Sequence, residues 1–354
     1  MDSTIGLINT YSTLNIGDSA IYSALASMTP NAQVFAQVQD VEPEYTPNLQ
    51  LLDPLPTCDA YISVGGDIFN NAREGFITKA FLKNLYQLTR SPKQTFVFGQ
   101  SIPRSCHGLS FQALTWCLRR LAAVCVRDVE SYQRLTKAGV SAILSYDSAF
   151  VLEVTKQAKR EAQDIFQALD VVSNLVTLIS LRTFDAMYAH DNQRFAQQLV
   201  GLCRNLLARG EQPVLLIQSR AYGSDNDLEM AAAIVTQVPQ VKIFNPFLAT
   251  TTLSRWQLVM GALAIARQIV AIRYHTAVLA LASGRVPFNL YYSNKGRDLT
   301  ERLKIPGCNL AHFDPEIHLA PILQTAQQSF GHEAIRHQVQ QNFNTCFAKV
   351  RKHS

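Results

Sequence analysis

The chain has little of what marks metal proteins, disulfide-rich proteins or membrane proteins. Its seven cysteines are odd in number, scattered and never spaced as CxxC, which argues against zinc fingers and a disulfide framework. No window is apolar over the length of a membrane span, and no basic segment followed by an apolar one resembles a leader. His, Cys and carboxylate residues do not cluster at ligand spacing, so we expect neither a metal nor a cofactor. These absences predict a cytoplasmic protein.

Charged residues are also scarce. They make up 17% of the chain against 47% hydrophobic residues, a balance that suits a folded protein and argues against long disordered stretches. The net charge of +5 is weak evidence for nucleic acid and fits an enzyme of anionic substrates equally well, and we expect no nucleic-acid partner. A chain of 354 residues is too long for one ordinary core, and no repeat of solenoid period occurs. Two domains are therefore expected.

Short runs of β-branched residues alternate with longer helix-period segments, which predicts an α/β fold of parallel sheets with crossover helices. The expected strands are 4–9, 32–37, 60–64, 95–99, 123–127 and 142–145, and then 175–181, 214–218, 241–244, 269–272 and 288–291. The polar stretch 156–167 is expected to form a surface helix between the two series. We therefore predict two Rossmann-like lobes, 1–155 and 170–315, with C-terminal helices at 316–354 that could pack on either lobe.

Ligands of open parallel sheets bind at the carboxyl ends of the strands, so we look for function in the loops that follow them. The first loop leads into a helix, whose N-terminal N–H groups suit a phosphate or carboxylate. Asp18 could equally be only a helix cap there, and Gly17 only a turn residue. The candidates from the loops of the first lobe are Asn15, Gly17, Asp18, Gly65, Gly66, Asp67, Gln100, Ser101 and Arg127.

In the second lobe, cations follow the strand ends. Arg182 lies just past one strand, Arg273 and His275 begin a helix of small residues, and Lys295 follows the last strand. Singly, each is more often a structural ion pair or a solvated group than a ligand. Together with Arg127 they could converge on one small polyanion, because forked hydrogen bonds from arginine are worth roughly 1.5–3 kcal/mol each.

These segments resemble, in order and spacing, the motifs of the polysaccharide pyruvyltransferase family. The segment 15–21 resembles its opening NxGDxAI motif, 65–66 its glycine loop, and 99–102 its GQSI segment. The segment 126–131 resembles its VRDxxS motif, and Asp147 its aspartate at the end of the first lobe. Arg273 and His275, with Tyr292 and Lys295 further on, resemble its RxH and YxxK region. The resemblance spans most of the chain.

The resemblance implies a glycosyltransferase-B-like fold and transfer of pyruvate from phosphoenolpyruvate, a co-substrate, to two hydroxyls of a sugar as a ketal. The acceptor would be a cell-surface or exopolysaccharide glycan or its lipid-linked precursor, which would bring the protein into peripheral contact with the inner membrane. The first lobe would hold the acceptor and the second the donor. Two alternatives stay open: a nucleotide-sugar-dependent glycosyltransferase of the same two-lobed fold, and a non-catalytic relative.

Ketal formation from an enol phosphate needs a proton donor, a base for the sugar hydroxyls, and cations for carboxylate and phosphate. We expect His275 to be the general acid, because histidine titrates at about pH 6.5. Asp18 or Asp67 is expected to accept a sugar proton. We expect Arg273, with Arg127 or Arg182, to bind the donor, and Lys295 to neutralise the leaving phosphate. The other substrate-binding candidates are Asn15, Gly17, Gly65, Gly66, Gln100 and Ser101.

Overall fold

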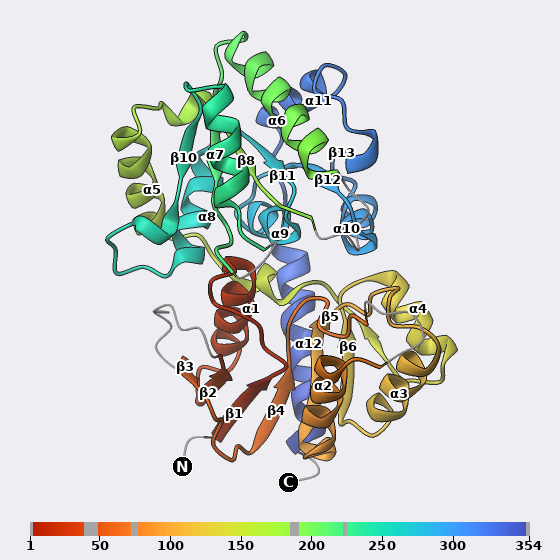
Figure 1. Ribbon diagram of the computed structural model, residues 1–354. Helices are drawn as coiled ribbons and strands as arrows, with labels where there is room; N and C mark the ends of the chain where they lie inside the picture. The colour runs from red at the N-terminus through yellow and green to blue at the C-terminus, as the bar shows by residue number, and fades with distance from the viewer. Residues whose placement is uncertain (1–2, 39–48, 72–76, 185–190, 222–224, 352–354) are drawn as a thin grey trace. The chain divides into compact units, whose positions relative to one another are not determined.

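Two compact units make up the protein. The computed structural model describes residues 3–38, 49–71, 77–184, 191–221 and 225–351 (Figure 1). The first unit comprises residues 1–13, 18–151 and 333–354, and the second comprises residues 14–17 and 152–332. Each unit holds one parallel sheet with helices packed on it, which confirms the predicted α/β class. None of the helices in the described part combines the length and the apolar character that a membrane span requires.

The first unit is built on a seven-stranded parallel sheet in the order β3-β2-β1-β4-β5-β6-β7. Its strands are β1 (Ser3–Ile8), β2 (Ala32–Gln37), β3 (Leu49–Leu52), β4 (Ala60–Ser63), β5 (Thr95–Gln100), β6 (Ala123–Val126) and β7 (Ile143–Leu144). Its helices are α1 (Ile16–Ser27), α2 (Lys79–Thr89), α3 (Gly108–Leu118), α4 (Val129–Lys137) and α12 (Glu333–Arg351). The strand order reverses between β1 and β4, and a ligand of such a sheet binds beside this switch point.

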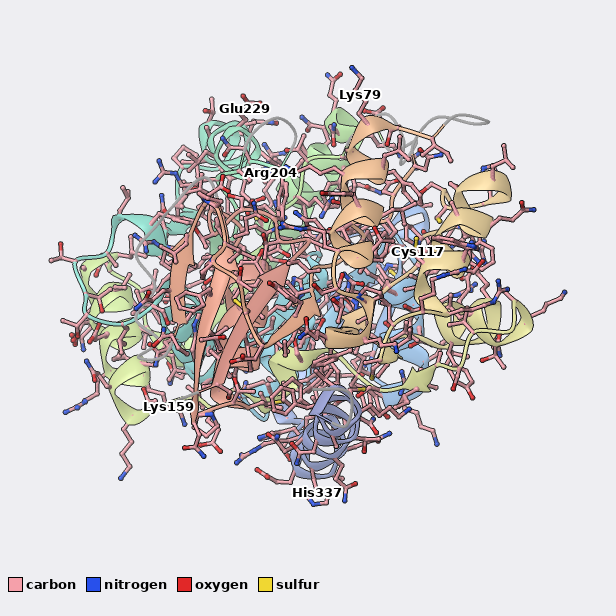
Figure 2. All side chains as sticks on the ribbon, turned by 90° about the horizontal axis from the view of Figure 1, so that it is seen from below. Lys79, Cys117, Lys159, Arg204, Glu229 and His337 are labelled. Atoms are coloured by element: carbon pink, nitrogen blue, oxygen red, sulfur yellow. The ribbon has the colours of Figure 1, made fainter. Side chains whose placement is uncertain are left out.

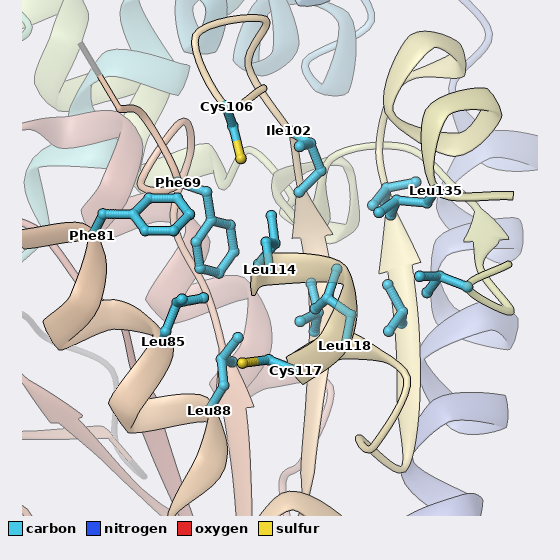
Figure 3. Close-up of a cluster of buried hydrophobic side chains, with 14 of the residues drawn as sticks. Phe69, Phe81, Leu85, Leu88, Ile102, Cys106, Leu114, Cys117, Leu118 and Leu135 are labelled. Atoms are coloured by element: carbon cyan, nitrogen blue, oxygen red, sulfur yellow. The ribbon is translucent and has the colours of Figure 1, made fainter. Parts of the chain in front are cut away.

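Apolar side chains of α2 and α3 face the sheet of the first unit. Phe81, Leu85 and Leu88 lie on one side of α2, since they are three to four residues apart, and Leu114 lies on the inner side of α3. All four belong to one buried cluster (Figure 3). Burial of each such side chain contributes roughly 1.5–3 kcal/mol, so this cluster holds both helices on the sheet.

The last helix of the chain, α12, packs in the first unit beside β5 and β6 (Figure 1). Phe343 of α12 contacts Phe96 and Phe98 of β5 edge to face, with ring centroids 5.8 and 5.2 Å apart. All three rings are buried. The sequence left open where the C-terminal helices pack, and these rings show that α12 completes the core of the first unit.

The second unit is built on a six-stranded parallel sheet in the order β10-β9-β8-β11-β12-β13. Its strands are β8 (Val176–Ser180), β9 (Gln212–Leu216), β10 (Lys242–Phe244), β11 (Gln268–Ala271), β12 (Phe288–Tyr291) and β13 (Gly307–Asn309). Its helices are α5 (Lys156–Ala168), α6 (Asn192–Leu207), α7 (Leu228–Gln237), α8 (Arg255–Ile265), α9 (Tyr274–Ala282), α10 (Asn294–Leu303) and α11 (Leu319–Gln324). The polar stretch predicted as a surface helix is α5, which packs against α8 within this unit.

Two edge strands, β3 and β13, were not predicted from the sequence. Each is four residues long or shorter, and β13 is the sequence Gly-Cys-Asn, which has no β-branched residue. A strand at the edge of a sheet pairs on one side only, so its residues need not follow the pattern of a buried strand. The central strands, by contrast, are fully buried apolar runs, and the sequence pattern located them within a few residues.

Candidate functional site

Three of the predicted segments meet around Arg127 in the first unit. The Arg127 side chain is fully buried, and its Nη1 donates a hydrogen bond to Asp147 Oδ2 at 2.5 Å. Its Nε donates to Ser101 Oγ at 2.9 Å, and Asp67 Oδ1 lies 4.0 Å from Nη2. One guanidinium therefore holds the GQSI segment and Asp147 together, with the loop after β4 close by.

Further hydrogen bonds tie the same segments to one another. Ser131 Oγ accepts from the Ile102 amide at 2.7 Å and donates to Asp128 Oδ2 at 2.8 Å. Asp128 caps the N-terminus of α4, because its Oδ1 accepts from the Ser131 amide. Gln100 Nε2 donates to the Val64 carbonyl oxygen at 2.6 Å. The VRDxxS pattern thus reflects a helix cap that also fixes the neighbouring loop.

Asn9 and Gly65 have left-handed backbone conformations at the ends of β1 and β4. Gly65 has a φ of +105°, and a Cβ there would lie 2.9 Å from Cγ2 of Ile68 and 3.0 Å from the Asn9 carbonyl oxygen. Asn9 has a φ of +58°, and its Nδ2 donates to Ser63 Oγ at 2.9 Å. Residues other than glycine rarely adopt this conformation, and those that do cluster at functional sites. Asn9, beside the switch point, is therefore a site candidate that the sequence reasoning missed.

The two carboxylates considered as bases have different surroundings. Asp67 has 26% of its side chain exposed, whereas Asp18 is buried in the first turn of α1. Asn15, which precedes the helix, accepts a hydrogen bond from the Gly17 amide at 3.0 Å. The capping position is therefore taken by Asn15, and Asp18 lies where a negative charge complements the helix dipole.

In the second unit, Arg273 is buried between two aspartates. Its Nη1 donates to Asp225 Oδ1 at 2.6 Å, and its Nη2 donates to Asp227 Oδ1 at 2.6 Å. Asp227 Oδ2 also accepts from the backbone amides of Gln218 and Ser219, at 2.8 and 2.9 Å. Two carboxylates thus oppose the single charge of Arg273, and only part of its N–H donors remains for another acceptor.

These contacts shift the pKa values of the three groups. Burial alone would raise the pKa of Asp225, but the charges of Arg273 and Arg182, with hydrogen bonds from Arg273 and Ser219, hold it below its usual value. Burial raises the pKa of Asp227, although Arg273 and two backbone amides oppose this effect. Burial alone would lower the pKa of Arg273, but the two carboxylates raise it. Asp225 and Arg273 are therefore both charged at neutral pH.

The segment Leu14–Gly17, which belongs to the second unit, lies along the loop that follows β9. Asn15 forms an isolated antiparallel bridge with Ser219, and its Nδ2 donates to Asp225 Oδ2 at 3.1 Å. Because Asp225 also accepts from Arg273, the opening motif and the RxH motif are joined through a carboxylate that neither of them contains.

Gly17 lies directly against His275, which is in the first turn of α9. A Cβ at position 17 would be 2.0 Å from Nδ1 and 2.4 Å from Cγ of the imidazole, so only glycine fits beside this ring position. The ring of Tyr274 contacts the imidazole edge to face, with centroids 5.4 Å apart. Gly17 thus helps to define where the imidazole lies, in addition to forming the start of α1.

Two cations of the second unit lie over aromatic rings. The guanidinium of Arg182 is 4.9 Å from the ring centroid of Tyr292, and the ammonium of Lys295 is 5.4 Å from that of Tyr274. Such contacts contribute about 0.5–1 kcal/mol at exposed sites and about 2 kcal/mol when desolvated. Both cations are half-buried and follow the carboxyl ends of β8 and β12, where an anion could approach them.

The structure brings the predicted site residues together in one group per unit. The first unit gathers Gly65, Gly66, Asp67, Gln100, Ser101 and Arg127, with Asp18 on α1. The second gathers Asn15, Gly17, Arg182, Arg273, His275 and Lys295. That Arg127 shares one ligand with the cations of the second unit stays a prediction.

Asp225 and Asp227 were also missed by the sequence reasoning. They lie after β9 in a stretch of Ser, Asp and Asn, which is typical of an ordinary polar loop. A signal was nevertheless present, because an arginine at the end of a central buried strand needs carboxylate partners, and the neighbouring loops are where they must come from.

Replacement of Arg127 by Met should lower the unfolding free energy of the first unit by about 3–5 kcal/mol, because Asp147 would stay buried without its cation. Hydrogen exchange of the β5 and β6 amides in increasing denaturant would measure the change. Adding Asp147→Leu should recover part of the loss. Arg104→Met is the control, since Arg104 is 66% exposed and pairs with Glu130, and should cost at most about 1 kcal/mol. Equal losses for Arg127→Met and Arg104→Met would contradict the role of the buried pair.

Because its pKa is lowered on folding, Asp225 should stabilise the second unit above its unfolded pKa of about 3.9. This contribution is lost as the pH falls through the lower folded value. Asp225→Asn should therefore show a shallower loss of stability than the unchanged protein as the pH falls through the unfolded value and below it. Fluorescence of buried Trp256, in a Trp116→Phe background, would report unfolding of this unit. Asp164→Asn on the surface of α5 is the matched control; if Asp225→Asn and the unchanged protein have the same slope, the idea is wrong.

Solved structures of other proteins share the fold. UDP-GlcNAc 2-epimerase from Methanocaldococcus jannaschii matches with a TM-score of 0.60 and 9% identity, over 98% of this chain and 99% of that one. A putative UDP-N-acetylglucosamine 2-epimerase from Listeria monocytogenes gives 0.58 and 9%, over 98% and 97%. The α,α-trehalose 6-phosphate synthase from Burkholderia multivorans gives 0.54 and 11%, over 99% of both chains. At these identities the likeness concerns the fold, and it confirms the predicted glycosyltransferase-B-like class.

No protein with a curated description matches the chain. The family model described as polysaccharide pyruvyl transferase matches residues 15–294. This range begins at Asn15, includes Arg127, Arg273 and His275, and ends one residue before Lys295. The chain therefore belongs to the polysaccharide pyruvyl transferase family.

Proposed function

We propose that the protein transfers pyruvate from phosphoenolpyruvate to two hydroxyls of a sugar, forming a ketal and releasing phosphate. The observation that carries the proposal is the position of His275, whose ring lies against Gly17 and Tyr274 in the first turn of α9. An imidazole held at the N-terminus of a helix can donate a proton to an anionic substrate that binds there. The family membership supports a transferase that acts on polysaccharide.

The proposed reaction begins with a proton from His275 to the methylene carbon of phosphoenolpyruvate. Carbon 2 then has oxocarbenium character, and a sugar hydroxyl forms a bond to it and loses its proton. The carbon–oxygen bond to phosphate breaks, and the second hydroxyl closes the ketal ring and loses its proton. One hydroxyl proton restores His275 and the other leaves with phosphate, so the steps balance without a cofactor.

We propose that the second unit binds the donor. Arg182 and Lys295 are half-buried cations suited to its carboxylate and phosphate, together with the N–H groups at the start of α9. Arg273 holds the loop after β9 through Asp225 and Asp227. Its N–H donors that are not used in these bonds would bind phosphoenolpyruvate, as the sequence predicts. Arg273 would thus both fix the position of this loop and contribute to binding of the donor.

We propose that the first unit binds the acceptor, through the loops that carry Gly65, Gly66, Gln100 and Ser101. Of the two candidate bases, Asp67 is the better proposal, because its partly exposed carboxylate can reach a sugar hydroxyl while Asp18 is buried. The acceptor would be a cell-surface or exopolysaccharide glycan, or its lipid-linked precursor at the inner membrane. A polysaccharide acceptor agrees with the family.

Gly17→Ala should reduce kcat by at least tenfold with little change in global stability, because the new Cβ would displace the imidazole of His275. Pyruvyl transfer kinetics and thermal unfolding would measure the two effects. Gly331→Ala is the control in the same unit, since a Cβ there meets no atom within 4 Å. A Gly17→Ala enzyme as active as the Gly331→Ala enzyme would remove Gly17 from the positioning of the acid.

The proposal itself is tested by donor specificity and by His275. Phosphoenolpyruvate should saturate the protein in calorimetric titration, whereas UDP-sugars should not bind. Lys295→Ala should weaken phosphoenolpyruvate binding by about tenfold to a hundredfold, since a charge-assisted hydrogen bond is worth roughly 1.5–3 kcal/mol. Arg297→Ala on the same helix should not, because Arg297 is 47% exposed and pairs with Glu301.

His275→Ala should bind phosphoenolpyruvate but release no phosphate when a panel of glycans is supplied. Mass spectrometry of the glycans would detect the added pyruvate ketal made by the unchanged protein. Saturation by a UDP-sugar in place of phosphoenolpyruvate would favour a nucleotide-sugar-dependent glycosyltransferase. Full phosphate release by His275→Ala would show that another group protonates the donor.

A further inference from the structure

The outer sides of α2 and α3 in the first unit carry large apolar side chains. Leu82 and Tyr86 on α2 are 51% and 65% exposed and lie one turn apart. Leu109 and Trp116 on α3 are 68% and 52% exposed and lie two turns apart on one side of the helix. We call these four residues the α2–α3 face.

The α2–α3 face is not needed for the core of the first unit. The two helices contact each other and pack on the sheet through a separate set of buried residues on their inner sides, which include Phe81, Leu85 and Leu114 (Figure 3). Single exposed apolar residues are common on proteins, as Leu248 and Ile317 illustrate in the second unit. The residues of the α2–α3 face differ from these in lying on two helices that contact each other.

The sequence that forms this region is entirely basic in its charge. From residue 77 to residue 120, the stretch that holds α2 and α3, it contains no Asp or Glu. Exposed Lys79 and Lys83 flank Leu82 on α2, and Lys79 points away from the ribbon (Figure 2). Arg120 lies over the ring of Trp116 at 3.5 Å. The exposed basic residues are Lys79, Lys83, Arg90, Lys93, Arg119 and Arg120, whereas Arg104 is exposed but pairs with Glu130.

We infer that the α2–α3 face binds the surface of a membrane that contains anionic lipid. Trp, Tyr and Leu side chains favour the boundary between headgroups and acyl chains, while Lys and Arg on the same face attract anionic headgroups. A lipid surface offers negative charge and apolar depth across the whole face, which matches this pairing of residues. The contact is peripheral and does not depend on the pyruvyl transfer proposed above, although a lipid-linked acceptor would lie in the same surface.

Co-sedimentation of the whole protein with vesicles tests the inference without donor or acceptor. Binding to vesicles of phosphatidylcholine with phosphatidylglycerol should be at least tenfold stronger than binding to phosphatidylcholine alone, and should weaken in high salt. Absent binding, or equal binding to both vesicles, would overturn the inference. Neither result bears on phosphate release from phosphoenolpyruvate, so the two proposals fail separately.

Matched variants locate the surface. Lys79→Glu with Lys83→Glu should weaken vesicle binding by at least about tenfold, whereas Lys156→Glu with Lys159→Glu on α5 makes the same charge change in the second unit and should have little effect. Equal losses from the two pairs would mean that net charge alone drives binding. That result would exclude the α2–α3 face as the binding surface.

A second set of variants tests the apolar residues of the α2–α3 face, with a matched control in the second unit. Leu82→Ser with Trp116→Ser should also weaken vesicle binding, and Leu248→Ser with Ile317→Ser in the second unit should not. Circular dichroism of each variant would show that the fold is retained. If both pairs bind vesicles as the unchanged protein does, no apolar contact forms at this face and the inference fails.

Trp116 also reports contact directly, because the other tryptophan of the chain, Trp256, is only 7% exposed. In a Trp256→Phe background, Trp116 emission should shift to shorter wavelength when anionic vesicles are added, and lipids brominated near the headgroup should quench it. Vesicle binding with unchanged Trp116 emission would mean that a different surface meets the membrane. Co-sedimentation of the unchanged protein serves as the check if the Trp256→Phe protein is unstable.

Discussion

The site of the second unit depends on one buried guanidinium. Arg273 lies at the end of a central strand, and Asp225 and Asp227 bring two ionised or ionisable carboxylates to it from the loop after β9. Removing such charges from water is expensive, and a buried ion pair is weak evidence for stability as such. Its value here is geometric, because the same carboxylates also hold Asn15 and two backbone amides. The opening motif and the loop after β9 are therefore both fixed to Arg273, which directly precedes α9.

The first unit uses the same physical solution with other residues. Arg127 is buried at the end of β6, pairs with Asp147 and donates a second hydrogen bond to Ser101 Oγ. In both units, an arginine that follows a strand end is held by carboxylates of its own unit. A sequence pattern that places arginines at strand ends therefore selects residues that the structure buries among carboxylates, but it does not separate an arginine that binds a ligand from one that fixes the loops around it.

The sequence predicts features that depend on neighbouring residues better than features that depend on contacts between distant parts of the chain. Hydrophobic period and length predicted the parallel sheets and their central strands, because those are local properties of buried runs. The motifs identified Gly17, Arg273 and His275 as candidate site residues. Asp225 and Asp227 were not predicted as site residues, because their role arises only when the loop after β9 contacts the end of β11. The contact of Gly17 with His275 was not predicted for the same reason, since the two residues lie near opposite ends of the range that matches the family model.

Charge balance decides which groups of the second unit can attract a donor. Asp225 and Asp227 together oppose the charge of Arg273, so this trio by itself offers no net positive charge to an anion. Under the proposed function, the attraction for the donor would come from Arg182, Lys295 and the N-terminus of α9. Arg182 also lowers the pKa of Asp225, which shows that its charge is felt at the trio. Under the proposed function, Arg182 and Lys295 would therefore bind the donor, while buried Arg273 fixes the loop after β9 through Asp225 and Asp227.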